Sequence, residues 1–199
     1  MVTSNPNFFG SPHSDVSEKI PVMRPRMPSP DTVRNHVAKV LSSATFSNFG
    51  PQVRRLEKRF ADFLGVEPSQ VVATSSATQA IAGAVAVSGV QEWLVPSWTF
   101  TATVSGILQG SGRPVFTDIQ DGSHWADFPR NIPVSTGSMP VAPFGLHPFE
   151  GPQLKHAGIQ IVDAAASLGS SESIGQERIK ADAVIFSLHA TKPMGIGEG

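Results

Sequence analysis

The feature that most constrains the fold of this chain is an alternation of short apolar segments with helix-like segments. Strand-like segments lie at residues 70–76, 92–97, 113–119, 158–169 (where the strand runs into a loop) and 181–189. Helix-like segments at residues 77–89 and 100–112 separate the first three of them. Such alternation with short connections is typical of a mainly parallel sheet with helices on both faces. We therefore expect an α/β fold.

Two further helices are expected ahead of the sheet. One begins near Pro30, and the other lies within residues 48–66 and ends at Gly65. The apolar residues at helical spacing are Val33, Val37 and Val40 in the first helix, and Val53, Leu56, Phe60 and Phe63 in the second. Residues 1–20, rich in Ser, Asn, Pro and Gly, are expected to form a mobile tail, and residues 119–140 a loop or an irregular crossover.

The composition argues against several classes of function. The net charge is -1, with 15 basic and 16 acidic residues, so a nucleic-acid or membrane partner is not expected. The chain has no cysteine, and its six histidines lack HxxxH or HExxH spacing, which disfavours a zinc site. The most apolar stretch, residues 80–90, is too short to span a bilayer, and the N-terminus does not resemble a signal peptide. We expect a soluble, cytoplasmic protein.

A candidate phosphate site lies at the start of the helix-like segment 77–89. Ser76 and Gln79 have the spacing of a capping box, so the helix is expected to begin just after Ser76. The free backbone N–H groups of Ala77 and Thr78 would then favour an anion. Taken alone, a capped helix without a ligand explains this pattern more simply.

Three more polar or aromatic positions follow predicted strands. Trp98 and Phe100 could stack on a planar ligand, although aromatic residues after a strand more often pack in the core. Asp163 follows an apolar strand, and a partly buried carboxylate needs a cation or hydrogen-bond donors; a helix cap or a structural ion pair would also explain it. Lys192 lies six residues after the apolar run 183–186 of the last strand, among hydroxyls and glycines, where a desolvated lysine could form a Schiff base.

Together these positions are more specific than any one of them. Ligands of open α/β sheets bind at the carboxyl ends of the strands, where all four are expected to lie. A phosphate site, an aromatic ring, a buried aspartate and a lysine are what pyridoxal 5'-phosphate (PLP) requires. The lysine forms the imine, and the aspartate keeps the pyridine nitrogen protonated.

These residues stand in motifs that resemble the DegT/DnrJ/EryC1/StrS sugar aminotransferases, which are fold-type-I PLP enzymes. The resemblance runs from about Met23 to Gly199 and includes TSSATQA, VPSWTFTATVSGILQGSGRPVFTDI, PVAPFG and VDAAASLG. The final stretch, FSLHATKPMGIGEG, is close to the Ser-x-His-x-x-Lys…Gly-Glu-Gly signature of the family and is the most specific motif in the chain.

The resemblance implies a role for each matching residue. Lys192 is the expected Schiff-base lysine and general acid/base, and Asp163 the partner of the pyridinium nitrogen. Phe100 occupies the ring-stacking position. The expected phosphate contacts are Ala77, Thr78 and Ser187, and His189 belongs to the signature without an assigned chemical role.

The sequence departs from the family pattern in two ways. Ala166 stands where many members carry Gln or His, which weakens the expected cofactor contacts. Family chains also continue well past the glycine loop, so this chain looks like the N-terminal part of a longer enzyme. The expected organisation is a tail at residues 1–20 and a PLP-binding large domain at residues 21–199. The C-terminal end of that domain and the small C-terminal domain would be absent.

The implied activity is transfer of an amino group, with glutamate as the expected donor, to a keto group of a nucleotide-linked sugar. It would serve amino-sugar or polysaccharide biosynthesis, in a homodimer. A related dehydratase would carry histidine in place of the lysine, so Lys192 argues against it. An inactive fragment or assembly partner that keeps the fold remains the alternative. A nucleotide-binding Rossmann domain is disfavoured, because GIGEG does not fit G-x-G-x-x-G.

Overall fold

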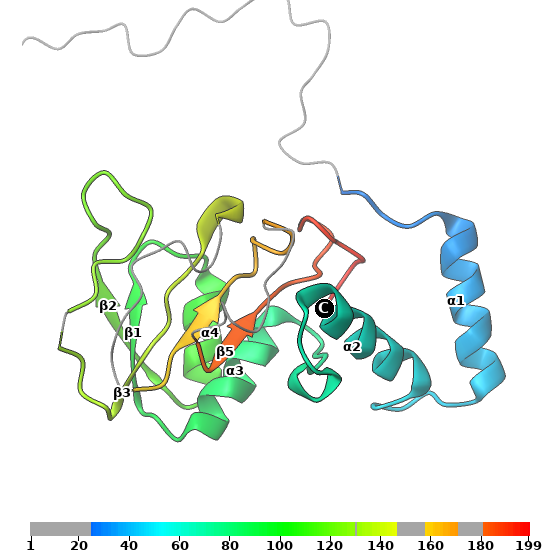
Figure 1. Cartoon of the computed structure of the whole chain (residues 1–199), viewed down its shortest axis with the longest axis horizontal. Helices are drawn as coiled ribbons and strands as arrows, with labels where there is room; N and C mark the ends of the chain where they lie inside the picture. Colours follow the sequence, from blue (N-terminus) through cyan, green and yellow to red (C-terminus); the bar gives the residue numbers. More distant parts are fainter. Residues whose placement is uncertain (1–24, 130, 147–157, 171–180) are drawn as a thin grey trace, which may run out of the picture.

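The computed structural model describes residues 25–129, 131–146, 158–170 and 181–199 (Figure 1). The tail predicted at residues 1–20 lies outside them. The α-helices are α1 (Pro30–Ser43), α2 (Pro51–Leu64), α3 (Ala77–Ser88) and α4 (Thr101–Gln109), and the 3-10 helices are η1 (Pro68–Gln70) and η2 (Pro143–Gly145). The strands are β1 (Glu92–Pro96), β2 (Arg113–Thr117), β3 (Thr136–Ser138), β4 (Ile161–Asp163) and β5 (Ala183–Ile185).

The described strands pair in parallel, as the sequence predicts. β1 pairs with β2 on one side and with β3 on the other. β4 pairs with β5, and the isolated bridges Ser138–Gln160 and Val141–Asp163 connect the two groups. The strand order is therefore β2-β1-β3-β4-β5, which places the carboxyl ends of all five strands at one edge.

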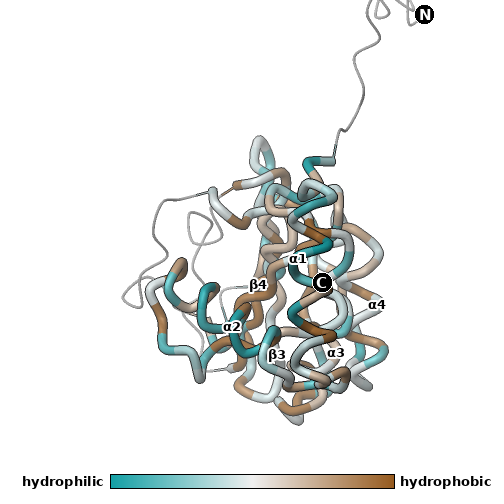
Figure 2. The backbone as a smooth tube through the Cα atoms, turned by 90° about the vertical axis from the view of Figure 1, so that its right-hand side faces the viewer, coloured by the Kyte–Doolittle hydropathy of each residue, from teal (hydrophilic) through white to brown (hydrophobic). Residues whose placement is uncertain are grey.

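The main core lies between these strands and the helices α3 and α4. It consists of Ile81, Val85, Trp93, Val95, Ile107, Met139, Ile161 and Ile185. α3 packs directly on α4 at Gly106, where a Cβ atom would lie 2.6 Å from Cγ2 of Ile81. The absence of a side chain there lets the two helices approach closely. Figure 2 shows β4 as a brown, hydrophobic segment of the tube, in line with its buried Ile161 and Val162.

The sheet differs from the sequence prediction at two places. The strand predicted at residues 70–76 is wrong: residues 71–74 run without strand pairing, and the backbone N–H of Ala73 donates to Oε1 of Glu57 at 3.2 Å instead. β3 was not predicted, because its sequence, Thr-Gly-Ser, has no apolar residue and falls within the expected loop at residues 119–140. All three of its residues are nevertheless buried.

The two N-terminal helices occur where they are expected, but their faces differ from the prediction. α2 begins after Gly50 and ends at Gly65, which has a φ of 69°. Its buried residues are Glu57, Ala61 and Leu64, while Phe63 of the predicted face is exposed. α1 lies beyond α2, away from the strands (Figure 1), and none of its residues is buried within the described part of the chain.

Candidate active site

Asp163 lies at the carboxyl end of β4 and is 6% exposed. Its Oδ2 accepts a 2.6 Å hydrogen bond from the hydroxyl of Thr103, and its Oδ1 accepts one of 3.1 Å from the backbone N–H of Ala165. Burial raises the pKa of Asp163, while these two hydrogen bonds and the positive charge of Lys192 act in the opposite direction. The sequence prediction of a buried carboxyl group with hydrogen-bond donors is confirmed.

Thr103 is a site residue that the sequence analysis missed. It is fully buried on α4, and because its hydroxyl proton goes to Asp163, it must accept the 2.7 Å hydrogen bond that it shares with Thr99. A chain of donors therefore runs from Thr99 through Thr103 to the carboxylate. The available signal was the spacing of two threonines four residues apart, around the helix start that follows β1.

A cavity of about 870 Å³ lies at the carboxyl edge of the sheet. Residues of β1's exit loop, of the segment after β4 and of the C-terminal loop line it, among them Trp98, Thr99, Phe100, Ala166, Thr191 and Lys192. The structure thus brings Phe100 and Lys192 together, although they are far apart in the sequence. Among the described residues, its lining does not include Ala77, Thr78, Asp163 or Ser187.

The two aromatic residues after β1 have different surroundings. Trp98 packs against Phe144, with ring centroids 5.4 Å apart, and stacks on His124 at 6.1 Å. Phe100 is the N-cap residue of α4, and 76% of its surface is exposed. Trp98 is therefore held in a wall of the cavity by its neighbours, while the ring of Phe100 is free to contact a ligand.

The start of α3 has the cap that the sequence predicts. The side chain of Ser76 accepts a hydrogen bond from the N–H of Gln79 at 3.3 Å. The side chain of Gln79 bonds to Gln109 at 2.8 Å and not to the cap residue, so the capping box is half formed. Ala77 and Thr78 occupy the first helical turn, whose backbone N–H groups lack partners within the helix.

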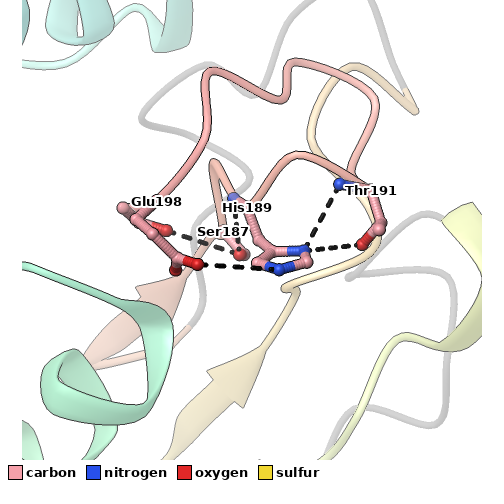
Figure 3. A network of polar contacts seen from close by, with 5 residues as sticks. Ser187, His189, Thr191 and Glu198 are labelled. Atoms are coloured by element: carbon pink, nitrogen blue, oxygen red, sulfur yellow. Dashed lines mark hydrogen bonds and ion pairs between the residues drawn. The ribbon is translucent and has the colours of Figure 1, made fainter. Parts of the chain in front are cut away.

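Lys192 belongs to the loop of residues 187–199, which follows β5. Figure 3 shows this loop with Ser187, His189, Thr191 and Glu198 labelled. Its side chain is half-buried and forms no ion pair within the described part of the chain. Its backbone N–H donates to the carbonyl of His189 at 2.8 Å, and its own carbonyl accepts from Gly195 at 3.0 Å. Ser187, at the start of this loop, is buried, and its hydroxyl accepts from the N–H of His189 at 3.2 Å.

The described residues contain no group of three His, Asp or Glu side chains that could hold a metal ion. Within the same residues, no helix is long and apolar enough to cross a membrane.

Comparison with known proteins decides the family. The profile of the DegT/DnrJ/EryC1/StrS aminotransferase family matches residues 30–132. The chain belongs to this family. The match covers half of the chain and contains Ala77, Thr78 and Phe100 of the candidate site.

Curated relatives match most of this chain. Protein Rv3402c of Mycobacterium tuberculosis is 31% identical over 209 residues, which cover 94% of this chain and 50% of that protein. The dTDP-4-amino-4,6-dideoxy-D-glucose transaminase of Shigella dysenteriae is 29% identical over 189 residues, or 89% of this chain and 50% of the enzyme. The chain thus spans about half the length of the curated relatives it matches.

Solved structures share the fold. AtS13 from Actinomadura melliaura superposes with a TM-score of 0.72 at 24% identity, over 89% of this chain and 51% of that one. NtdA from Bacillus subtilis with bound cofactor PMP gives a TM-score of 0.67 at 24% identity, over 92% of this chain and 45% of that one. The predicted fold class, that of the PLP-dependent aminotransferases, is confirmed.

Proposed function

We propose that this chain carries the cofactor-binding part of a PLP-dependent sugar aminotransferase, with the N-terminal part of its large domain at residues 21–199. The observation that carries the proposal is the placement of three predicted groups. Phe100 and Lys192 line one cavity, and the charge of Lys192 acts on the buried carboxyl group of Asp163. A lysine, an aromatic ring and a buried carboxyl group are the side chains that PLP binding requires.

The buried carboxyl group fits this cofactor on physical grounds. Asp163 receives two hydrogen bonds, but within the described part of the chain it forms no ion pair. Burial of a carboxylate is costly unless a cation accompanies it. A protonated pyridine nitrogen would supply that cation.

Each of the other site residues has a proposed role toward the cofactor. When bound, PLP supplies an electron-withdrawing ring that stabilises negative charge on the adjacent substrate carbon. Lys192 would hold the cofactor and carry a proton at its Nζ, and Asp163 would keep a proton on the ring nitrogen. Phe100, which lines the cavity, would contact the ring. Thr103 donates to Oδ2 of Asp163 and the backbone N–H of Ala165 donates to Oδ1, and together these two bonds fix the orientation of the carboxyl group.

The phosphate contacts are proposed at Ala77, Thr78 and Ser187. Free N–H groups and the helix dipole at the start of α3 favour a dianion. Ser187 is buried at the base of the loop that carries Lys192, so its hydroxyl belongs to the same edge of the sheet.

The proposed substrates are a nucleotide-linked keto sugar and an amino-acid donor, with glutamate as the expected donor. Named relatives support the sugar: GDP-perosamine synthase of Caulobacter vibrioides is 26% identical over 192 residues. The relative SpsC of Bacillus subtilis is a spore coat polysaccharide biosynthesis protein, which is in line with a role in polysaccharide synthesis. We further propose that the enzyme is a homodimer and works in the cytoplasm.

A second candidate is a chain that keeps this fold and assembles without turnover. Its motivation is that the chain spans about half the length of the relatives it matches. Binding of PLP combined with transamination would exclude this candidate.

The test is covalent labelling of the purified chain with PLP. The visible spectrum is recorded, the adduct is reduced with borohydride, and the modified peptide is mapped by mass spectrometry. We expect one dominant adduct, on Lys192.

The control variants are Lys192→Ala and Lys58→Ala. Lys58 is an exposed lysine whose Nζ lies 3.2 Å from Asp62, so its loss should leave the adduct unchanged. Lys192→Ala should abolish the adduct and leave the fold intact. Labelling spread over surface lysines, or an unchanged spectrum for Lys192→Ala, would overturn the assignment.

A further inference from the structure

The side chain of His189 joins two parts of the loop that carries Lys192 (Figure 3). Its Nδ1 lies 2.8 Å from the hydroxyl of Thr191 and 3.3 Å from the backbone nitrogen of Thr191. Its Nε2 faces the carboxylate of Glu198, 3.8 Å from Oε1. The ring therefore lies between the residue before Lys192 and the far end of the loop.

These contacts determine where the imidazole carries its proton. A backbone N–H can only donate, so Nδ1 must be the acceptor of the hydrogen bond from Thr191. The neutral ring then carries its proton on Nε2, toward Glu198. Nδ1 is thus engaged within the loop by Thr191, while Nε2 lies near the Glu198 carboxylate.

Backbone hydrogen bonds join the beginning of the loop to its end, while few backbone bonds hold its tip. The N–H of Leu188 donates to Gly199 at 2.8 Å, and that of Ala190 donates to Gly197 at 2.8 Å. At the tip, the N–H of Lys192 donates to the carbonyl of His189 at 2.8 Å. The ring of His189 adds a hydrogen bond to Thr191, and so fixes the turn from which the side chain of Lys192 extends.

This geometry is the histidine counterpart of an Asx turn. In an Asx turn, a side-chain oxygen of Asn or Asp accepts from the backbone N–H two residues later. Here Nδ1 of His189 accepts from the N–H of Thr191, which is also two residues later. The loop has little room to adjust, since a Cβ atom on Gly195 would lie 2.5 Å from the carbonyl oxygen of Ala190.

We propose that His189 is a positioning residue for Lys192: it holds the turn at residues 189–192 through Nδ1, so that the lysine enters the cavity already oriented. The inference rests on the proposed function of Lys192 and adds a role for the signature histidine. It concerns the orientation of the lysine and assigns no proton transfer to the ring.

Because the contact is made through Nδ1, the inference can be tested with Asn and Gln at position 189, whose side-chain amides lie at different distances from the backbone. In His189→Asn, the side-chain oxygen lies near the position of Nδ1 and can form a true Asx turn with Thr191. In His189→Gln, the amide is one methylene further out, toward Glu198, and no longer matches that turn. His189→Ala removes both contacts, and Glu198→Gln tests the second contact alone.

The first readout is the rate of PLP labelling at Lys192. We expect His189→Ala and His189→Gln to label roughly 3- to 10-fold more slowly, the loss of about one net hydrogen bond. His189→Asn and Glu198→Gln should stay within about twofold of the unsubstituted chain. Equal rates for Asn and Gln at position 189, or an unchanged rate for Ala, would overturn the proposal.

The second readout needs no cofactor and separates the two proposals. Nitrogen NMR of the imidazole should show the Nε2–H tautomer, and hydrogen exchange at the amide of Thr191 should accelerate in His189→Ala and His189→Gln but not in His189→Asn. If the unsubstituted chain failed to label Lys192, the function proposed for this chain would fail, while tautomer and exchange would still decide the role of the ring. An Nδ1–H tautomer, or exchange unaffected by His189→Ala, would contradict the positioning role.

Discussion

The hydroxyl of Thr103 donates a 2.6 Å hydrogen bond to Asp163, although 60 positions separate the two residues in the chain. Thr103 lies in α4, and Asp163 ends β4, so the bond joins a helix to the carboxyl edge of the sheet. Thr99 donates in turn to Thr103. The orientation of the carboxylate is therefore set by a helix that follows a different strand.

We predict that Thr103→Val weakens PLP binding at Asp163. Valine has the shape of threonine but cannot donate, and loss of this donor raises the pKa of Asp163 further, since the bond lowers it now. Removal of a hydrogen bond to a charged group corresponds to about 1.5–3 kcal/mol, or at least a tenfold weaker affinity. The affinity is measured by absorbance titration with PLP.

Thr103→Ser is the matched control, because serine keeps the hydroxyl and loses only a methyl group. It should bind PLP nearly as well as the unsubstituted chain. Equal affinity for Val and Ser at position 103 would show that the hydrogen bond does not matter for the cofactor.

We predict that Asp163→Asn stabilises the cofactor-free chain at neutral pH but removes aminotransferase activity. Burial raises the pKa of Asp163 in the folded state above its usual value of 3.8. A raised carboxyl pKa favours folding below pH 3.8, and this contribution is lost as the pH rises through the folded-state pKa. Asparagine does not ionise, so the advantage of the variant should be larger at pH 7 than at pH 5.

The measurement is urea unfolding of both chains at the two pH values, without PLP. The amide can keep the existing partners, since its oxygen can accept from Ala165 and its nitrogen can donate to Thr103, whose hydroxyl can reverse. A variant that is less stable at pH 7 would instead indicate that the carboxylate is a structural group.

The sequence predicts most of the sheet because its strands carry continuous apolar runs. β1, for example, buries four consecutive residues, Trp93 to Pro96, and such runs indicate a buried parallel strand. β3 has no such run, since it is Thr-Gly-Ser, and a ring of Trp93 occupies the space where Gly137 lacks a side chain. That burial depends on a distant strand and leaves no local pattern.

The sequence predicts the candidate site only in part. Asp163 and Lys192 can be predicted because each follows a recognisable apolar strand. Thr103 is not, because its role depends on a partner far away in the chain and its hydroxyl resembles that of any buried threonine. The buried position of Glu57 was also missed, since a helix face with a glutamate at its centre does not fit an apolar stripe.

We predict that Glu57→Ala destabilises the chain by about 1–3 kcal/mol, because it leaves a backbone donor without its partner. Glu57 is 5% exposed. Its two carboxylate oxygens accept hydrogen bonds from the backbone N–H of Ala73 and from the guanidinium of Arg54, both at 3.2 Å. The free energy of unfolding is measured in urea. Glu57→Gln should lose less, since its amide oxygen can still accept from Ala73, and Arg54→Ala should have a small effect because Arg54 is largely exposed.

We predict that Gly106→Ala destabilises the chain by about 1–3 kcal/mol through overpacking between α3 and α4. The added Cβ would lie 2.6 Å from Cγ2 of Ile81 and 3.1 Å from the carbonyl oxygen of Thr78. Thr78 lies in the first turn of α3, so the displacement should reach the proposed phosphate contacts. PLP affinity is therefore expected to fall together with stability.

Gly83→Ala is the matched control on α3, because a Cβ there meets nothing within 4 Å. In a helix interior, alanine is favoured over glycine by about 0.5–1 kcal/mol, so this variant should be as stable as the original chain or more stable. Thermal unfolding with and without PLP distinguishes the two positions. If Gly106→Ala unfolded at the same temperature as Gly83→Ala, the close approach of α3 and α4 at Gly106 would not be required for stability.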